Sequence, residues 1–321
     1  MLDTSSLQRF KEHCPGFRHY YALVDCAIDE RIYPQITKSS CDSSTLFWHG
    51  IGETLKAASP HIVELGSDQF THWLFQEGWG NSWCIFLASN KPMTELVQHF
   101  RRLAKVRGPN NENWYFRYCD PRYMRVLLPL CDSAQLNRIL GDTGVFWMEG
   151  DTPEKISIFQ RKQGKLQFIS RNVDGSDSHV SVYDPTEQPG SGTTDNLLKI
   201  RQDQCEQFTH AVRREFVRKM ATTFLEKYPD RLKSIAPDQL FRLVDAAISQ
   251  MHQLGAKSRQ DAYHFINACI LFGWGFLQDD SQKWIRTDYL ENSELGNISL
   301  RLEALYYYSG RQSMMDGKLE A

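Results

Sequence analysis

Thiols and imidazoles are the side chains in this sequence best suited to nucleophilic chemistry. A cysteine nucleophile needs an adjacent base and a third group that orients the base. Cys84 and Cys119 are the candidates, and neither lies in a known local signature of a cysteine enzyme. A cysteine-dependent hydrolase or transferase therefore stays an alternative, since sequence alone does not show which histidine lies beside either thiol.

The sequence contains no residue pattern typical of a metal or cofactor site. The eight cysteines contain no C-x-x-C pair, and the ten histidines contain neither an i, i+4 pair nor H-E-x-x-H. Gly78 and Gly80 do not begin a dinucleotide fingerprint, because position 83 is tryptophan. We expect no metal site and no cofactor.

Length and composition indicate an ordinary globular chain. Its 321 residues suggest about two domains. Hydrophobic residues make up 41% and charged residues 24%, which is enough for a real core. A net charge of −2 gives no general attraction to nucleic acid. No apolar run approaches the roughly 20 residues that span a bilayer, and no secretory signal is visible, so we expect a cytoplasmic protein that does not insert into membranes.

The elements of the first half are organised around residues 70–89. Phe70, Trp73 and Leu74 recur at helical spacing, and Gly78 is expected to end that helix with a positive φ. The nearly all-apolar run at 82–87 is typical of a strand covered on both faces. This stretch predicts a packed layer of helix and sheet.

The rest of residues 1–171 fits a mixed α/β domain. Aromatic and β-branched runs predict strands at 20–25, 45–48, 61–65, 113–119, 145–148, 156–159 and 166–169. Apolar periodicity and N-cap residues predict helices at 92–106, after Asp120, and from Asp132 or Ser133 to 140.

The composition changes at 172–196, which is rich in Ser, Asp, Gly, Thr and Pro and is predicted to be a linker. Beyond it, at 197–321, the patterns are helical throughout. A long helix is ended by Pro229, a second covers 240–254, Ser258 caps a third, and a fourth covers 298–308. The expected fold is an α/β domain followed by an all-α domain.

Four blocks within residues 20–150 resemble the N-terminal domain of the effector chaperones of type VI secretion, the adaptor family called Tec or Tap. They are YALVD at 21–25 (followed by Arg31 and Tyr33), HIVEL at 61–65 after Pro60, FTHWLFQEGWGNSWCIFL at 70–87, and FRYCDPRYMRVLLP at 116–129. Cys84 stands where the family usually has glycine. A further piece, FGWGFLQDDSQKW at 272–284, is similar to the ending of several type VI accessory chaperones, although Asp280 and Lys283 replace its prolines.

The resemblance implies an adaptor rather than an enzyme. Members bind a cognate toxic effector in the bacterial cytoplasm and help load it onto the secretion spike, on VgrG or a PAAR tip protein. The expected partners are therefore a toxin and a spike protein, with no nucleic acid. A structural protein of the secretion baseplate is the other alternative.

Five candidate partner-binding residues lie in the α/β half, and each has a structural explanation as well. Trp79 and Trp83 lie at the turn that contains Gly78 and Gly80, which we call the glycine turn, where aromatic side chains either contact a partner or pack in the core. Arg117, Asp120 and Arg122 form a polar group at a strand-to-helix corner. In the functional explanation this polar group contacts a partner. In the structural explanation Asp120 caps the helix and pairs with an arginine. Both explanations can hold together.

Three candidates, Phe208, Phe216 and Phe224, lie on one face of the long helix. Effector segments held by such adaptors are often apolar, so a chaperone needs a groove that covers apolar surface. Our hypothesis is that the two domains form the walls of that groove and that these phenylalanines line part of it. They fit the core of the helical domain equally well.

Overall fold

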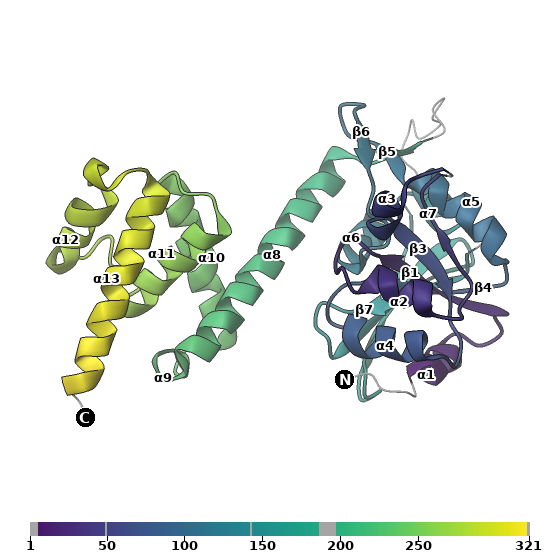
Figure 1. The fold of residues 1–321 in the computed structure, drawn as a ribbon, viewed down its shortest axis with the longest axis horizontal. Coiled ribbons are helices and arrows are strands. Elements are labelled where there is room, and N and C mark those ends of the chain that lie inside the picture. The colour runs from purple at the N-terminus through teal and green to yellow at the C-terminus, as the bar shows by residue number, and fades with distance from the viewer. Residues whose placement is uncertain (1–5, 49, 142, 186–196, 320–321) are drawn as a thin grey trace. The chain divides into compact units, whose positions relative to one another are not determined.

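The computed structural model describes residues 6–48, 50–141, 143–185 and 197–319 (Figure 1). The chain divides into two compact units, Met1–Thr209 and His210–Ala321. The first unit combines a sheet with helices, and the second consists of helices. The expected fold class is therefore confirmed.

The first unit is built on an eight-stranded sheet in which every strand pair is antiparallel. The strand order is β10-β9-β8-β7-β4-β1-β3-β2. The strands are β1 (His19–Asp25), β2 (Ser43–Thr45), β3 (Pro60–Glu64), β4 (Cys84–Ser89), β7 (Val145–Glu149), β8 (Lys155–Lys162), β9 (Lys165–Asn172) and β10 (Ser178–Tyr183). A small second sheet has the order β11-β5-β6 and contains β5 (Lys105–Arg107), β6 (Asn113–Tyr115) and β11 (Leu198–Lys199).

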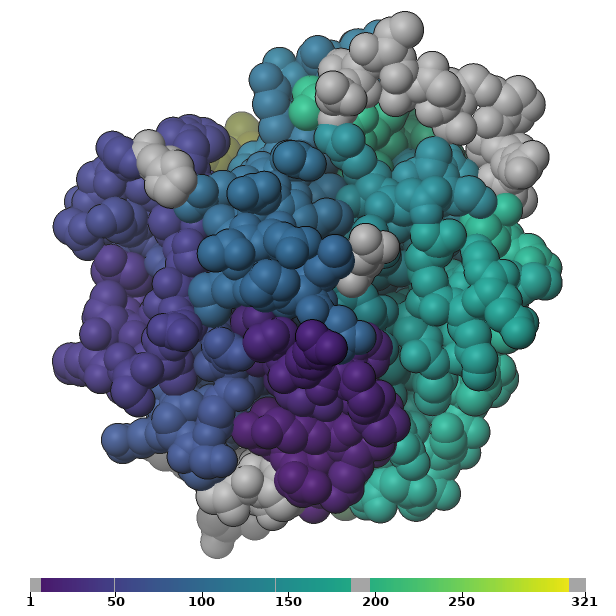
Figure 2. Space-filling model, turned by 90° about the vertical axis from the view of Figure 1, so that its right-hand side faces the viewer, coloured from purple at the N-terminus to yellow at the C-terminus, as the bar shows by residue number. Residues whose placement is uncertain are grey.

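Helices cover both faces of the large sheet, which is why its central strands are apolar on both sides. Residues of α1 (Ser6–His13), α2 (Ile32–Lys38) and α4 (Gln69–Gly78) share a core with Val24 and Phe86. Residues of α5 (Met93–Leu103), α6 (Pro121–Leu127) and α7 (Ser133–Leu140) share another core with the alternate strand residues, such as Leu23 and Leu87. The short helix α3 (Glu53–Ala57) precedes β3. In Figure 2 the N-terminal segment lies on the surface between the segments drawn in blue and in teal.

The second unit has a single helical core. It contains most of α8 (Gln202–Lys227), with α9 (Pro229–Leu232), α10 (Pro237–Gln253), α11 (Arg259–Phe272), α12 (Lys283–Ile285) and α13 (Ile298–Leu319). Ser258 caps α11, as expected, in a reciprocal arrangement with Asp261. The ammonium of Lys227 donates to the hydroxyl of Tyr263 (2.8 Å) and to Oδ1 of Asn267 (3.1 Å), which ties α8 to α11.

Several predicted boundaries differ from those in the structure. Part of the predicted linker 172–196 is strand β10, which pairs with β9; residues 186–196 lie outside the described residues. The predicted helix 92–106 ends at Leu103, because the next residues pair with β6. The strand predicted at 45–48 lies earlier, at Ser43–Thr45, and the strand predicted at 113–119 stops at Tyr115.

The glycine turn also differs from expectation. Gly78 is the last residue of α4 and has no positive φ; a Cβ there would lie 3.1 Å from the ring of Trp83. Close packing, rather than a left-handed conformation, favours glycine at this position. The positive φ angles of the turn belong to Gly80 (84°) and Ser82 (59°).

Candidate functional site

Trp83 is a core residue. Its side chain is 2% exposed and its ring lies 5.2 Å from that of Trp73. The guanidinium of Arg31 covers the ring at 5.2 Å, a cation–π contact. Trp83 therefore packs in the core of the first unit and does not offer a surface to a partner.

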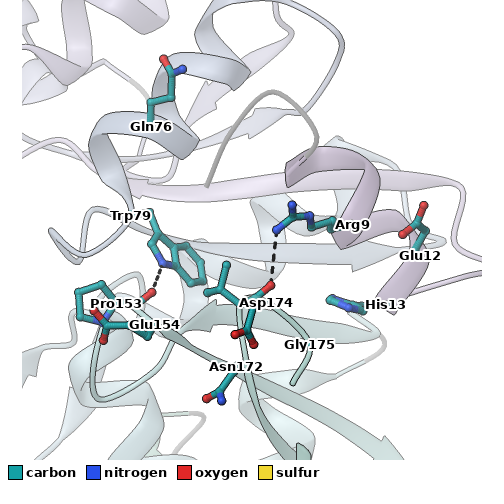
Figure 3. A pocket seen from close by; sticks show the side chains of 11 residues that line it. Arg9, Glu12, His13, Gln76, Trp79, Pro153, Glu154, Asn172, Asp174 and Gly175 are labelled. Atoms are coloured by element: carbon teal, nitrogen blue, oxygen red, sulfur yellow. Dashed lines mark hydrogen bonds between the residues drawn. The ribbon is translucent and has the colours of Figure 1, made fainter. Parts of the chain in front are cut away.

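Trp79 lies at a surface hollow (Figure 3). Its indole Nε1 donates to the carbonyl of Pro153 at 2.7 Å, and its ring lies 4.9 Å from that of Trp147. The hollow is bounded by α1, the end of α4, and the turns that follow β7 and β9. Trp79 is half-buried, with its polar edge already engaged. Trp79 therefore lines the hollow, and its indole N–H is already hydrogen-bonded within the protein.

The polar side chains that line this hollow include Arg9 and His13. Nη1 of Arg9 lies 3.5 Å from the carbonyl of Val173, at the edge of hydrogen-bonding distance. Burial, with the nearby charge of Arg171, lowers the pKa of His13 below its ordinary value. The imidazole is therefore neutral at pH 7, which makes it a poor anion ligand.

Arg117, Asp120 and Arg122 belong to two separate ion pairs. The buried carboxylate of Asp120 accepts from the backbone N–H of Arg122 (3.0 Å) and from its guanidinium Nη2 (2.7 Å). Asp120 thus caps α6 and pairs with an arginine, as its structural explanation predicts. Arg117 pairs instead with Asp25 at the end of β1, with Nη2 2.6 Å from Oδ2.

The three phenylalanines do not share a surface role. Phe224 is fully buried in the helical core, so it cannot line a groove. Phe216 is half-buried beneath the guanidinium of Arg259, at 5.6 Å. Phe208 belongs to the first unit and lies edge-on to Tyr123, at 5.7 Å.

The structure reveals a surface that the sequence patterns did not predict, which we call the aromatic patch: Phe47, Trp48 and Tyr115. Trp48 is 66% exposed and Tyr115 is 53% exposed. Phe47 stacks on Trp48 with ring centroids 5.5 Å apart, and meets Tyr115 edge-on at 5.6 Å. Large exposed aromatic side chains are typical of protein-binding surfaces. The sequence did not indicate the patch, because both runs are predicted as strands, at 45–48 and 113–119.

Neighbouring elements hold the aromatic patch in place. The backbone N–H of Phe47 donates to the hydroxyl of Thr45 (3.3 Å), and Arg101 of α5 donates to the carbonyl of Thr45 (3.0 Å). In the small sheet, drawn at one end of the first unit in Figure 1, Tyr115 lies opposite the exposed Lys105. The patch therefore combines apolar rings with a positive charge.

The thiols considered as nucleophiles are buried. Burial raises the pKa of Cys84 and of Cys119 well above the ordinary value. Cys26 lies beside a histidine, with Sγ 3.4 Å from Nδ1 of His61. Burial raises the pKa of that thiol to about 12 and lowers the pKa of His61, so the pair stays neutral. A neutral thiol is a weak nucleophile.

Two kinds of feature are absent from the residues that the structure describes. In that part of the chain, no group of three His, Cys, Asp or Glu side chains is placed to hold a metal ion. None of the helices described there combines the length and apolar character needed to cross a membrane.

Comparison with known proteins gives one match. Residues 20–138 match the model of a family described as "Domain of unknown function (DUF4123)". The matched segment begins at β1 and ends within α7, and it contains the glycine turn and the aromatic patch. No curated protein and no solved structure shows a significant match.

Proposed function

We propose that this protein is a non-catalytic adaptor of type VI secretion. It binds a cognate toxic effector in the bacterial cytoplasm and helps load it onto the VgrG or PAAR spike. One observation carries the proposal: the four blocks that resemble the Tec/Tap adaptors, from residue 21 to 129, all fall inside the family match at 20–138. The blocks that carry the resemblance and the family match therefore cover the same segment of the chain.

The aromatic patch supports this function because it offers an adaptor a surface for protein contact. Tryptophan and tyrosine dominate the centres of protein interfaces. Lys105 beside Tyr115 favours a partner segment that combines apolar side chains with an acidic one. We propose that the effector binds here.

The first experiment is a pull-down from a lysate of the source bacterium, with the full chain as bait and mass spectrometry as the readout. The expected result is one toxin-like protein together with a VgrG or PAAR protein. Stoichiometric recovery of baseplate proteins alone would instead favour the structural alternative. Turnover of a substrate by the purified chain, lost on changing one cysteine while the fold persists, would favour the enzyme alternative.

A variant then tests the patch itself. The double substitution Trp48→Ala with Tyr115→Ala removes two exposed rings, so the fold should persist, and we expect binding of the purified effector to fall at least about tenfold. Tyr307→Ala is the matched control, because Tyr307 is 59% exposed on α13. Equal binding by both variants would place the effector site elsewhere.

A further inference from the structure

Strand β10 forms one edge of the eight-stranded sheet. Half of the backbone N–H and C=O groups of β10 therefore point away from β9 and out of the sheet. The backbone N–H of Asn172 donates to the carbonyl of Asp177 at 3.0 Å, which fixes the alternation of the ladder between β9 and β10. His179, Ser181 and Tyr183 therefore direct their backbone groups toward β9. Ser178, Val180 and Val182 direct theirs outward, and no described residue hydrogen-bonds to them.

This edge lacks the usual protection against pairing. Edge strands in natural sheets are commonly blocked by a charged residue, a proline or a bulge. Residues 178–183 contain no Asp, Glu, Lys, Arg or Pro, and they pair with β9 without interruption. Val180 is 50% exposed and Val182 is 57% exposed. The opposite edge, β2, has only three residues.

The chemistry of β10 is symmetric about Ser181. A valine lies on each side of it, and an aromatic ring follows on each side, His179 and Tyr183. A strand with this symmetry is complementary to itself in antiparallel register. We propose that β10 pairs with β10 of a second copy of this chain, with Ser181 opposite Ser181, which joins two sheets into one.

The pairing satisfies both the backbone and the side chains. Val180 faces Val182 of the second copy, and the outward groups of these residues form about four backbone hydrogen bonds. His179 faces Tyr183 of the second copy, an aromatic cross-strand pair. Ser178 faces Asp184, so no two like charges meet. Two-fold symmetry is the commonest arrangement in homo-oligomers.

A cross-linking experiment tests the register. In this pairing the two Ser181 residues form a non-hydrogen-bonded pair with Cα atoms about 4.5 Å apart, within disulfide range. Ser181→Cys should give a covalent dimer on mild oxidation, seen on a non-reducing gel. Ser178→Cys is the matched control, because two copies of that position lie roughly 20 Å apart. Equal cross-linking of both variants, or of neither, would overturn the proposed register.

A second experiment tests the dimer without a new thiol. The purified wild-type chain should show a concentration-dependent dimer by light scattering or sedimentation. Val180→Pro removes an outward N–H that makes no bond within the sheet, so the variant should fold with unchanged circular dichroism and remain monomeric. A monomeric wild type, or a dimeric Val180→Pro, would refute the proposal. Neither result bears on effector binding, so the dimer proposal and the adaptor proposal are tested independently of each other.

Discussion

A single buried carboxylate accounts for the shape of the glycine turn. Glu149, at the end of β7, is 7% exposed. It accepts from the backbone N–H of Gly80 at 2.6 Å, and from the hydroxyl (2.5 Å) and the N–H (3.3 Å) of Ser82. The positive φ angles of Gly80 and Ser82 belong to this turn, which brings these donors to one acceptor. The turn therefore connects α4 to β4 and also ties both to β7.

Removing this carboxylate should destabilise the first unit. Glu149→Ala leaves buried donors without their acceptor, which costs about 1–3 kcal/mol of unfolding free energy. Chemical denaturation followed by tryptophan fluorescence measures the change. Asp151→Ala is the control, because its side chain is 75% exposed, and it should change stability by less than about 0.5 kcal/mol. An equal effect of both substitutions would contradict the role of Glu149.

Thiol reactivity follows from the burial of the cysteines. Six of the eight are buried, and only Cys41 and Cys205 are partly exposed. Burial raises the pKa of Cys14 and of Cys26 to about 12, so at pH 8 these thiols stay protonated. We expect the native protein to react slowly with a thiol reagent such as DTNB, and all eight thiols to react at once in denaturant. One fast-reacting buried thiol in the native state would contradict this expectation and would favour the alternative of a cysteine-dependent enzyme.

At the scale of elements, the start of α8 is fastened to the start of α7. The guanidinium of Arg201 donates to Oε1 of Gln135 (2.7 Å) and to the carbonyl of Leu130 (2.7 Å), and it lies 3.3 Å from Oδ2 of Asp132. Asp132 and Gln135 also cap α7 in a reciprocal arrangement. One arginine thus serves the ends of two helices.

Arg201→Met should loosen this junction. It removes one donor each from Gln135 and from the Leu130 carbonyl, which both still accept from Gln204, so the loss should be about 0.5–1.5 kcal/mol. Hydrogen exchange of the amides at 202–209 should become faster, while that of the β1 amides stays unchanged. Arg214→Met, on the exposed part of the same helix, is the control and should leave both rates unchanged.

The sequence predicted those elements whose own side chains determine them. The helix caps Asp120 and Ser258 are predicted correctly, and Asp132 is one of the two residues predicted for a third cap, because an N-cap acts within three residues of itself. The strands at the centre of the sheet are predicted to within two residues, because both faces are covered and the run is apolar: 82–87 is observed at Cys84–Ser89 and 20–25 at His19–Asp25. Such signals are local.

The elements missed depend on pairing between distant segments. The two-residue strand β11 exists because Leu198 meets Val106, more than ninety positions away along the chain. The aromatic patch was missed for a similar reason, since the contact of Phe47 with Tyr115 follows from the fold. Glu149 lies far from the turn that it holds, and no spacing rule connects them. Glu149 reaches the turn only because β7 lies beside β4 in the sheet.

At the scale of the whole molecule, the two units have separate hydrophobic cores. Ile62 is fully buried in the first unit, and Leu240 is fully buried in the second. Compact units with their own cores commonly unfold as independent steps. We therefore expect two transitions in differential scanning calorimetry.

Core substitutions should separate these transitions. Ile62→Ala and Leu240→Ala each remove a fully buried side chain, which typically costs 2–5 kcal/mol. Ile62→Ala should lower only the transition that also removes the β signal in circular dichroism, and Leu240→Ala only the other. A single transition shifted equally by both variants would mean that the chain unfolds as one unit.

The sheet order also has a consequence for synthesis on the ribosome. Strand β1 leaves the ribosome first, yet both of its neighbours, β3 and β4, are made later, and β7 follows β4 only after α5, α6 and α7. A nascent chain that has passed β4 but not reached β7 therefore carries a strand that is apolar up to its final Ser89 and has an open edge. Pausing of translation in that interval should promote aggregation, and cytosolic chaperones that recognise extended apolar segments should bind there.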